Sequence, residues 1–251
     1  MKTNEPMQQS RRLFLRSAGA VTIGVVVGVL PLGLRAASDL PKTLKIGVVG
    51  SGRIGGTVGE LWVKAGYQVM FSSLDIEHDK ALAARLGSGA RAGTPKEAAA
   101  FGEVVLIAVP YAALPQIGRD LGDLLKGKVV LDTCNPVPGR DGDMAVEAKA
   151  KGTGIASPQF LPGARLVRAF NSVGYSRLQS EAHRTGERVA IPLAADDAAA
   201  LQTAVRLVQD AGFEPVVVGP LARAKEFDAG TPVYGKALTA AELRRGLGIN
   251  P

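Results

Sequence analysis

Short, wholly apolar runs alternate along this chain with longer segments in which apolar residues recur every three or four positions. The apolar runs predict strands, and the periodic segments predict amphipathic helices. The expected strands lie at residues 44–49, 67–71, 104–109, 128–132, 165–170, 189–194 and 213–218. Because such strands need cover on both faces, the pattern predicts an α/β fold with a doubly wound parallel sheet, the Rossmann arrangement.

The helical segments lie between these strands. We expect helices at residues 54–65, 79–86, 95–101, 112–125, 145–151 and 197–211, and a short one near 239–247. Gly66, Gly87 and Gly212 follow three of them, as glycine often does at a helix C-terminus. Asp196 is the expected N-cap of the helix at 197–211.

A glycine-rich loop joins the first strand to the first helix. It reads Gly50-Ser51-Gly52-Arg53-Ile54-Gly55. In this strand–loop–helix setting the GxGxxG pattern predicts a dinucleotide site. Gly50 permits the tight turn, Gly52 lets a pyrophosphate approach the backbone, and Gly55 lets the helix pack on the sheet. The helix N-terminus adds N–H donors, and the other three residues of the loop are expected to face the same ligand.

The end of the second strand bears on which dinucleotide binds. An acidic residue there bonds the ribose 2′-hydroxyl of NAD, whereas an arginine holds the 2′-phosphate of NADP. Ser72 and Ser73 can hydrogen-bond either group, and Asp75 would oppose a phosphate if it pointed inward. The nearest cations are Lys80 and Arg85. These residues leave NAD and NADP both open.

The first 38 residues have a different character. A polar start with Arg11 and Arg12 precedes an apolar run at 18–34 and small residues that end at Ser38. This is the layout of a bacterial signal peptide, and the paired arginines resemble the signal for the twin-arginine translocation machinery. We expect a signal at 1–38, one domain at 39–251 and a periplasmic or cell-envelope location. An uncleaved signal would tether the protein to the membrane.

The charge of the chain lies partly in that leader. The whole chain has a formal charge of +7. Residues 1–38 hold five of the 30 basic residues and one of the 23 acidic residues, so the remainder carries 25 and 22, or +3. No basic block survives in the remainder, and no nucleic-acid partner is expected.

Reactive side chains are scarce. Cys134 is the single cysteine, and His78 and His183 are the two histidines. These numbers predict no disulfide and no metal site, which suits a protein that folds before export. Both histidines lie among charged residues, so we expect them at the surface. Cys134 is expected to be a small buried residue, with a thiol facing the nicotinamide as the alternative; Asp132 and Thr133 could be sheet-end caps or ligand contacts.

Later motifs add a resemblance. Their sequences are Ala108-Val109-Pro110, Leu131-Asp132-Thr133-Cys134-Asn135-Pro136, Val167-Arg168-Ala169-Phe170-Asn171-Ser172-Val173-Gly174 and Asp210-Ala211-Gly212-Phe213. With the glycine loop, they make residues 45 to about 247 resemble the NADPH-dependent reductases of the deazaflavin coenzyme. The same domain occurs in six-transmembrane metalloreductases, and pyrroline-5-carboxylate reductase shares its N-terminal part.

The resemblance implies positions for the ligands. It places Ala108, Val109 and Pro110 beside the nicotinamide. It places five residues in the cleft of the second substrate: Asn135, Pro136, Ala169, Phe170 and Asn171. Leu74 stands where that family has the arginine for the 2′-phosphate, which favours NAD.

The resemblance and the residues together predict an NAD(P)-dependent oxidoreductase. Its small-molecule hydride acceptor would be flavin-, deazaflavin- or quinone-like, and such chemistry needs aligned rings more than an acid–base residue. No catalytic side chain is therefore expected. We expect the residues from about 221 onward to form an arm or lid, and the cleft to be built from one domain, alone or as a homodimer. The alternatives are an exported, non-catalytic dinucleotide-binding module and a membrane-held partner of a redox complex.

Overall fold

The computed structural model describes residues 44–249. Its strands are β1 Lys45–Val49, β2 Gln68–Ser72, β3 Ala90–Ala92, β4 Val104–Ile107, β5 Val129–Asp132, β6 Arg165–Arg168, β7 Ala190–Ala195 and β8 Glu214–Gly219. Its helices are α1 Arg53–Lys64, α2 Ile76–Leu86, α3 Pro95–Phe101, α4 Leu114–Leu125, α5 Pro138–Lys151, α6 Thr153–Ala156, α7 Tyr175–Glu181, α8 Ala198–Asp210 and α9 Ala240–Gly246. Three 3₁₀ turns complete the list: η1 Tyr111–Ala113, η2 Ser157–Gln159 and η3 Leu221–Glu226.

The strands form one sheet in the order β3-β2-β1-β4-β5-β6-β7-β8. Neighbours are parallel except β6 and β7, which pair antiparallel. The doubly wound fold is therefore confirmed, with β7 and β8 reversed at one end. Because the chain turns from one side of β1 to the other before β4, a crevice forms beyond the carboxyl ends of β1 and β4.

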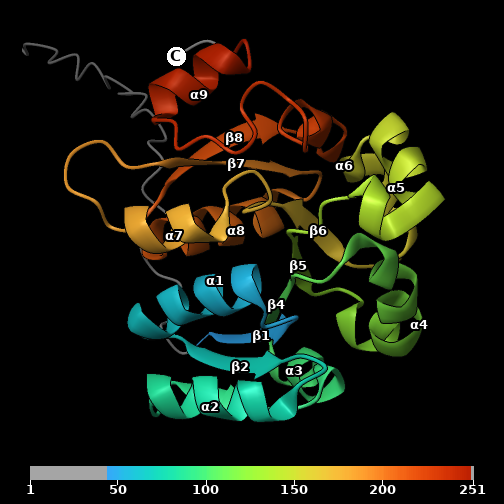
Figure 1. Ribbon diagram of the computed structural model, residues 1–251, viewed down its shortest axis with the longest axis vertical. Coiled ribbons are helices and arrows are strands. Elements are labelled where there is room, and N and C mark those ends of the chain that lie inside the picture. The colour runs from blue at the N-terminus through green and yellow to red at the C-terminus, as the bar shows by residue number, and fades with distance from the viewer. Residues whose placement is uncertain (1–43, 250–251) are drawn as a thin grey trace, which may run out of the picture. The chain divides into compact units, whose positions relative to one another are not determined.

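Helices cover both faces of the sheet (Figure 1). On one face α1 and α8 pack on the sheet and α7 packs against α1, and one apolar cluster includes Val58, Leu178 and Leu207 from these helices. On the other face α3, α4 and α5 contribute a second cluster around Ile107 and Leu121. Burial of these two apolar layers is the main favourable term in the stability of the fold.

Trp62 links α1 to α8 and to Phe170, which follows β6. It is the single tryptophan of the chain and is fully buried on α1. Its indole Nε1 donates to the carbonyl of Leu207 on α8 at 2.9 Å. Its ring meets Phe170 edge to face, with 5.9 Å between centroids.

Several element boundaries differ from the predicted ones. Helix α2 begins at Ile76 rather than 79, because the carboxylate of Asp75 accepts from two amides of its first turn. The cap of α8 is Asp197, which accepts from Ala200 N; Asp196 instead accepts from Leu221 N at 2.9 Å, so that prediction was wrong.

The segment after β8 packs back on the sheet. Phe227, Val233 and Leu243 form a third apolar cluster with residues of β7 and β8. The signal-peptide prediction falls outside the described residues. Within 44–249, no helix combines the length and apolar character that a membrane crossing needs.

Candidate functional site

The backbone of the glycine loop packs closely against its neighbours at two positions and is open at a third. Gly50 has a φ of +96°, and a Cβ there would lie 2.5 Å from the carbonyl oxygen of Ala108. A Cβ on Gly55 would lie 2.1 Å from the carbonyl oxygen of Gly50. A Cβ on Gly52, by contrast, would meet no atom within 4 Å. Packing therefore requires glycine at positions 50 and 55, whereas Gly52 faces open space.

Helix α1 presents its N-terminus at that open space. Gly52 is its N-cap, no side chain caps it, and its first turn contains no acidic residue. The first amides of a helix lack partners within the helix and carry a partial positive charge. The loop and the helix therefore fit the pyrophosphate of a dinucleotide.

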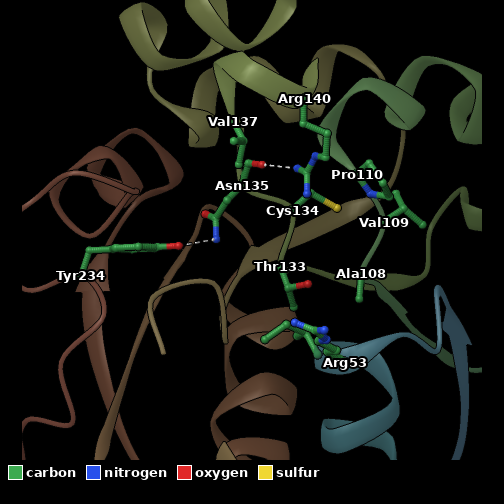
Figure 2. Close-up of a pocket in the computed structure, with 11 residues that line it drawn as sticks. Arg53, Ala108, Val109, Pro110, Thr133, Cys134, Asn135, Val137, Arg140 and Tyr234 are labelled. Carbon is green, nitrogen blue, oxygen red and sulfur yellow. Dashed lines mark hydrogen bonds between the residues drawn. The ribbon is translucent and has the colours of Figure 1, made fainter. Parts of the chain in front are cut away.

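A pocket of about 300 Å³ lies beside this loop (Figure 2). Its lining residues are Arg53, Ile54, Ala108, Val109, Pro110, Thr133, Cys134, Asn135, Val137, Arg140 and Tyr234. They come from the start of α1, the ends of β4 and β5, the start of α5 and the segment after β8. Six of the predicted ligand residues thus line one pocket. The other five were not predicted as ligands, although Thr133 and Cys134 were open candidates.

Asn135 is held on two sides. Its Nδ2 donates to the carbonyl of Asn171 at 2.7 Å and to the Tyr234 hydroxyl oxygen at 3.4 Å. The Nδ2 of Asn171 reaches the carbonyl of Phe227 at 3.5 Å. The carboxamide of Asn135 is therefore fixed between the end of β6 and the C-terminal segment.

Arg140 enters the pocket from the start of α5. It donates to both carboxylate oxygens of Asp141, at 3.0 and 2.8 Å, and to the carbonyl of Asn135 at 2.9 Å. Burial of Asp141 opposes its charged form, but hydrogen bonds from Arg140 and from the amides of Val137 and Ala112 outweigh this and lower its pKa. This carboxylate ties α5 to η1 and sets the position of the guanidinium.

Cys134 forms part of the pocket wall but is 1% exposed. Its Sγ lies 3.6 Å from the carbonyl oxygen of Ile107. Burial, and next the charge of Asp132, raise the pKa of the thiol well above its usual range. Thr133 also donates to Ile107 O, at 3.1 Å. Asp132 is a buried partner of Arg168, at 2.8 Å, rather than a pocket residue.

Arg53 is the first residue of α1. Its guanidinium carbon lies 5.2 Å from the ring centroid of Tyr175, at the start of α7. No carboxylate pairs with it among residues 44–249. A cation held by an aromatic ring at this point suits an anionic ligand.

The end of β2 lies outside this pocket. Ser72 is buried, and its hydroxyl donates to the carbonyl of Val48 at 2.7 Å. Its own carbonyl accepts from the amides of Gly50 and Ser51. Ser72 thus supports the glycine loop through its backbone. Ser73 and Asp75 lie at the start of α2 and bond one another and their neighbours.

Three residues expected in the cleft are placed in or near the core. Ala169 and Phe170 are fully buried in the first apolar layer, and Phe170 has a φ of +57°. Asn171 is 3% exposed and reaches the pocket only through Asn135. Pro136 follows Asn135 without lining the pocket. His78 and His183 are exposed, as predicted.

Tyr234 and Arg140 were missed as ligand residues. The sequence places Tyr234 about 100 residues beyond Asn135, within a segment expected only as an arm or lid, so nothing local indicated the contact. Arg140 lies in the first turn of α5, which begins at Pro138, whereas the predicted helix began at 145, so the sequence did not place Arg140 on a helix.

Part of the chain is similar to known oxidoreductases. Residues 45–136 match the family described as NADP oxidoreductase, coenzyme F420-dependent. Rat metalloreductase STEAP3 (Rattus norvegicus) is 28% identical over 196 residues, which is 76% of this chain and 37% of that protein. The chain therefore spans little more than a third of this relative.

Solved structures share the fold. A hypothetical protein from Sinorhizobium meliloti superposes with a TM-score of 0.66 at 25% identity, over 78% of this chain and 95% of that one. A proposed F420-dependent NADP reductase from Arthrobacter gives 0.60 at 20% identity, over 72% and 87%. An imine reductase from Myxococcus stipitatus in complex with NAD⁺ gives 0.54 at 17%, over 74% and 58%. The relatives with a described activity are oxidoreductases.

Proposed function

We propose that this protein is an NAD(P)-dependent oxidoreductase that passes hydride from a nicotinamide cofactor to a flavin-, deazaflavin- or quinone-like acceptor. The observation that carries the proposal is the open face of Gly52 at the uncapped N-terminus of α1, beside the pocket at the ends of β4 and β5. The family match over residues 45–136 supports the same cofactor class.

The lining residues divide by their chemistry. Ala108, Val109 and Pro110 form an apolar side next to the glycine loop and would border the nicotinamide, which supplies hydride when bound. Asn135 and Arg140 supply polar groups, and a hydrogen bond from Arg140 to the carbonyl of Asn135 joins them (Figure 2). An acceptor with a flat apolar body and hydrogen-bonding edges matches both kinds of lining residue.

The pocket residues can orient an acceptor without acid–base catalysis. No histidine, aspartate or glutamate lines the pocket. The amide of Asn135 and the hydroxyl of Tyr234 can hold the polar edge of a ring, while Val137 covers its apolar part. This arrangement suits an acceptor that delocalises the transferred charge itself.

The location of the protein is a separate part of the proposal. The leader at residues 1–38 supports export by the twin-arginine machinery, which would carry the folded protein with its cofactor. Fractionation of cells expressing the full chain would test the location, and the mass of the purified protein would show whether the leader is cleaved. Replacing Arg11 and Arg12 by lysine should hold the protein in the cytoplasm; an unchanged distribution would contradict this route.

The cofactor site is tested by Gly52→Val. A Cβ there would meet no protein atom within 4 Å, so the variant should fold, while the new methyl groups occupy the space of the pyrophosphate. Calorimetric titration with NADH and NADPH should show binding weakened by at least roughly 100-fold, equivalent to about 2.7 kcal/mol. Gly122→Val is the matched control, because a Cβ at Gly122 on α4 also meets no atom within 4 Å.

Catalysis is tested with defined acceptors. The full chain is mixed with NADH or NADPH and with FMN, menadione or a deazaflavin, and oxidation of the nicotinamide is followed. Turnover lost in Gly52→Val but kept in Gly122→Val would support the proposed reaction. Binding without turnover of any acceptor would favour a non-catalytic dinucleotide-binding module, and absence of binding would overturn the proposal.

A further inference from the structure

Ser51 of the glycine loop forms a compact polar cluster with Ser73, Asp75 and Asp79, which lie at the end of β2 and the start of α2. We propose that this cluster makes the protein select NAD(H) over NADP(H). The inference rests on the proposed function, because it concerns the ribose end of the same dinucleotide site. In this fold, the end of the second strand is where the 2′ position of the ribose is recognised.

Asp79 is the centre of the cluster. It is fully buried in the first turn of α2. One of its carboxylate oxygens accepts from the hydroxyl of Ser51, and the other accepts from the hydroxyl of Ser73 at 2.9 Å. Both carboxylate oxygens of Asp79 are therefore occupied by hydroxyl donors, beside the N-terminal end of α2.

The bonds to Asp79 decide what Ser73 can offer a ligand. A serine hydroxyl has one proton and two lone pairs. The proton of Ser73 has two acceptors within the cluster, Asp79 at 2.9 Å and the carbonyl of Asp75 at 3.1 Å, and one lone pair accepts from Asp75 N at 3.1 Å. Only an acceptor site remains. A ribose 2′-hydroxyl can donate to it, whereas an ionised 2′-phosphate brings acceptors of its own.

Asp75 occupies the amides at the N-terminus of α2, which could otherwise bind an anion. Its carboxylate caps α2, accepting from Glu77 N at 3.1 Å and from His78 N at 3.0 Å. The amides that could have bound a phosphate therefore already face a carboxylate. With Asp79, two negative charges lie where the extra phosphate of NADP would approach.

The neighbouring cations do not offset these charges. Lys80 pairs with Glu77 at 2.8 Å, and Arg85 pairs with Glu60 at 2.8 Å. Leu74, between Ser73 and Asp75, is fully exposed and brings no charge. An extra phosphate would thus lose its solvation without gaining a free cationic partner among these residues.

Calorimetric titration of the full chain with NADH and NADPH tests the selection. We expect NADH to bind at least roughly 10-fold more tightly. Equal or tighter binding of NADPH would overturn this inference and leave the proposed function standing. Binding of neither nucleotide would overturn both.

Two variants locate the effect. Leu74→Arg is exposed and should fold as the wild type does; it supplies a phosphate partner and should tighten NADPH binding roughly 10- to 100-fold, with NADH changed less than about threefold. Asp79→Asn should reduce the ratio of the NADPH and NADH dissociation constants, and thermal melting checks that the variant folds. Asp123→Asn, an exposed change of the same charge on α4, is the control. An unaltered ratio in Leu74→Arg would overturn the inference even if Asp79→Asn failed to fold.

Discussion

Cys134 shows how a residue can line a pocket without being reactive. Its thiol is 1% exposed, and burial is the largest cause of its raised pKa, followed by the charge of Asp132. Since the thiolate is the nucleophile in alkylation and disulfide exchange, a raised pKa suppresses both. Its role is to fill space behind the apolar side of the pocket.

The corresponding prediction concerns thiol labelling. In the native protein, Cys134 should resist iodoacetamide at neutral pH and react more quickly only as the pH rises, because the thiolate population rises with it. In concentrated urea it should react as a free cysteine does. Mass spectrometry of the two samples measures this, and equal labelling would show that the pocket wall opens readily.

Tyr234 is the residue by which the C-terminal segment reaches the pocket. Its hydroxyl oxygen accepts from Asn135 Nδ2 at 3.4 Å, so its proton remains free for a ligand. Tyr234→Phe should lower kcat/KM for a working acceptor by roughly 3- to 10-fold, about the value of one hydrogen bond. The dissociation constant for NADH should stay within about twofold. Weakened NADH binding would instead place Tyr234 against the cofactor.

At the scale of elements, the sequence identified most helices and strands because their apolar patterns are local. The helix α3 falls at the predicted bounds, since Thr94 and Glu97 form a capping box that is visible in the sequence. Strand β3 was missed because three residues are too few to show a period. Helix α7 was missed because Leu178 is its only fully buried residue.

The site residues also divide into those that local sequence patterns could place and those that depend on tertiary packing. The ends of β1 and β4 meet because parallel neighbours share an edge, so Arg53 and Ala108 could be placed from pattern and motif. Tyr234 could not, because its place depends on how Val233 packs against β7 and β8. Phe170 was expected in the cleft, yet its left-handed backbone turns the ring toward Trp62.

Helices α1 and α2 are joined by Glu60. It bonds Arg85 and Lys64, each at 2.8 Å. The hydrogen bond from Arg85 is the largest cause of a pKa lowered to about 2, although burial acts against it. A carboxylate with a lowered folded pKa stabilises the protein above its unfolded pKa, and this contribution is lost as the pH falls toward 2.

This arrangement predicts acid sensitivity. At neutral pH, Glu60→Gln should lower the melting temperature by about 1–4 °C. The difference from the wild type should shrink as the pH drops from about 4.5 toward 2. Melting curves across this range test it, with Glu147→Gln as control, because the Glu147–Lys151 pair is exposed and 3.8 Å apart. A gap that does not depend on pH would exclude the ion pairs as its cause.

At the scale of the whole described domain, a buried ionic network links the sheet to the C-terminal segment. Arg168 at the end of β6 is fully buried and pairs with Asp132 on β5 at 2.8 Å and with Asp228 after η3 at 3.3 Å. Asp228 also accepts from the amide and hydroxyl of Thr153 on α6. Removal of one partner would leave buried charge uncompensated.

Two substitutions on β6 test this network. Arg168→Leu should lower the free energy of unfolding by about 3–5 kcal/mol. Arg165→Leu on the same strand should cost less than about 1 kcal/mol, because its pair with Asp197 is partly exposed. Urea denaturation measures both. Similar costs would mean that the network adds no more than a surface pair.

Trp62 gives the protein a built-in optical reporter. It is the chain's one indole fluorophore, and it lies on the helix whose first turn faces the open side of Gly52. Its emission overlaps the absorption of reduced nicotinamides, so energy transfer should dim it when NADH or NADPH enters the pocket. Unfolding exposes the same ring to water and shifts its emission to longer wavelengths. One unlabelled sample can therefore report both occupancy of the site and the integrity of the fold.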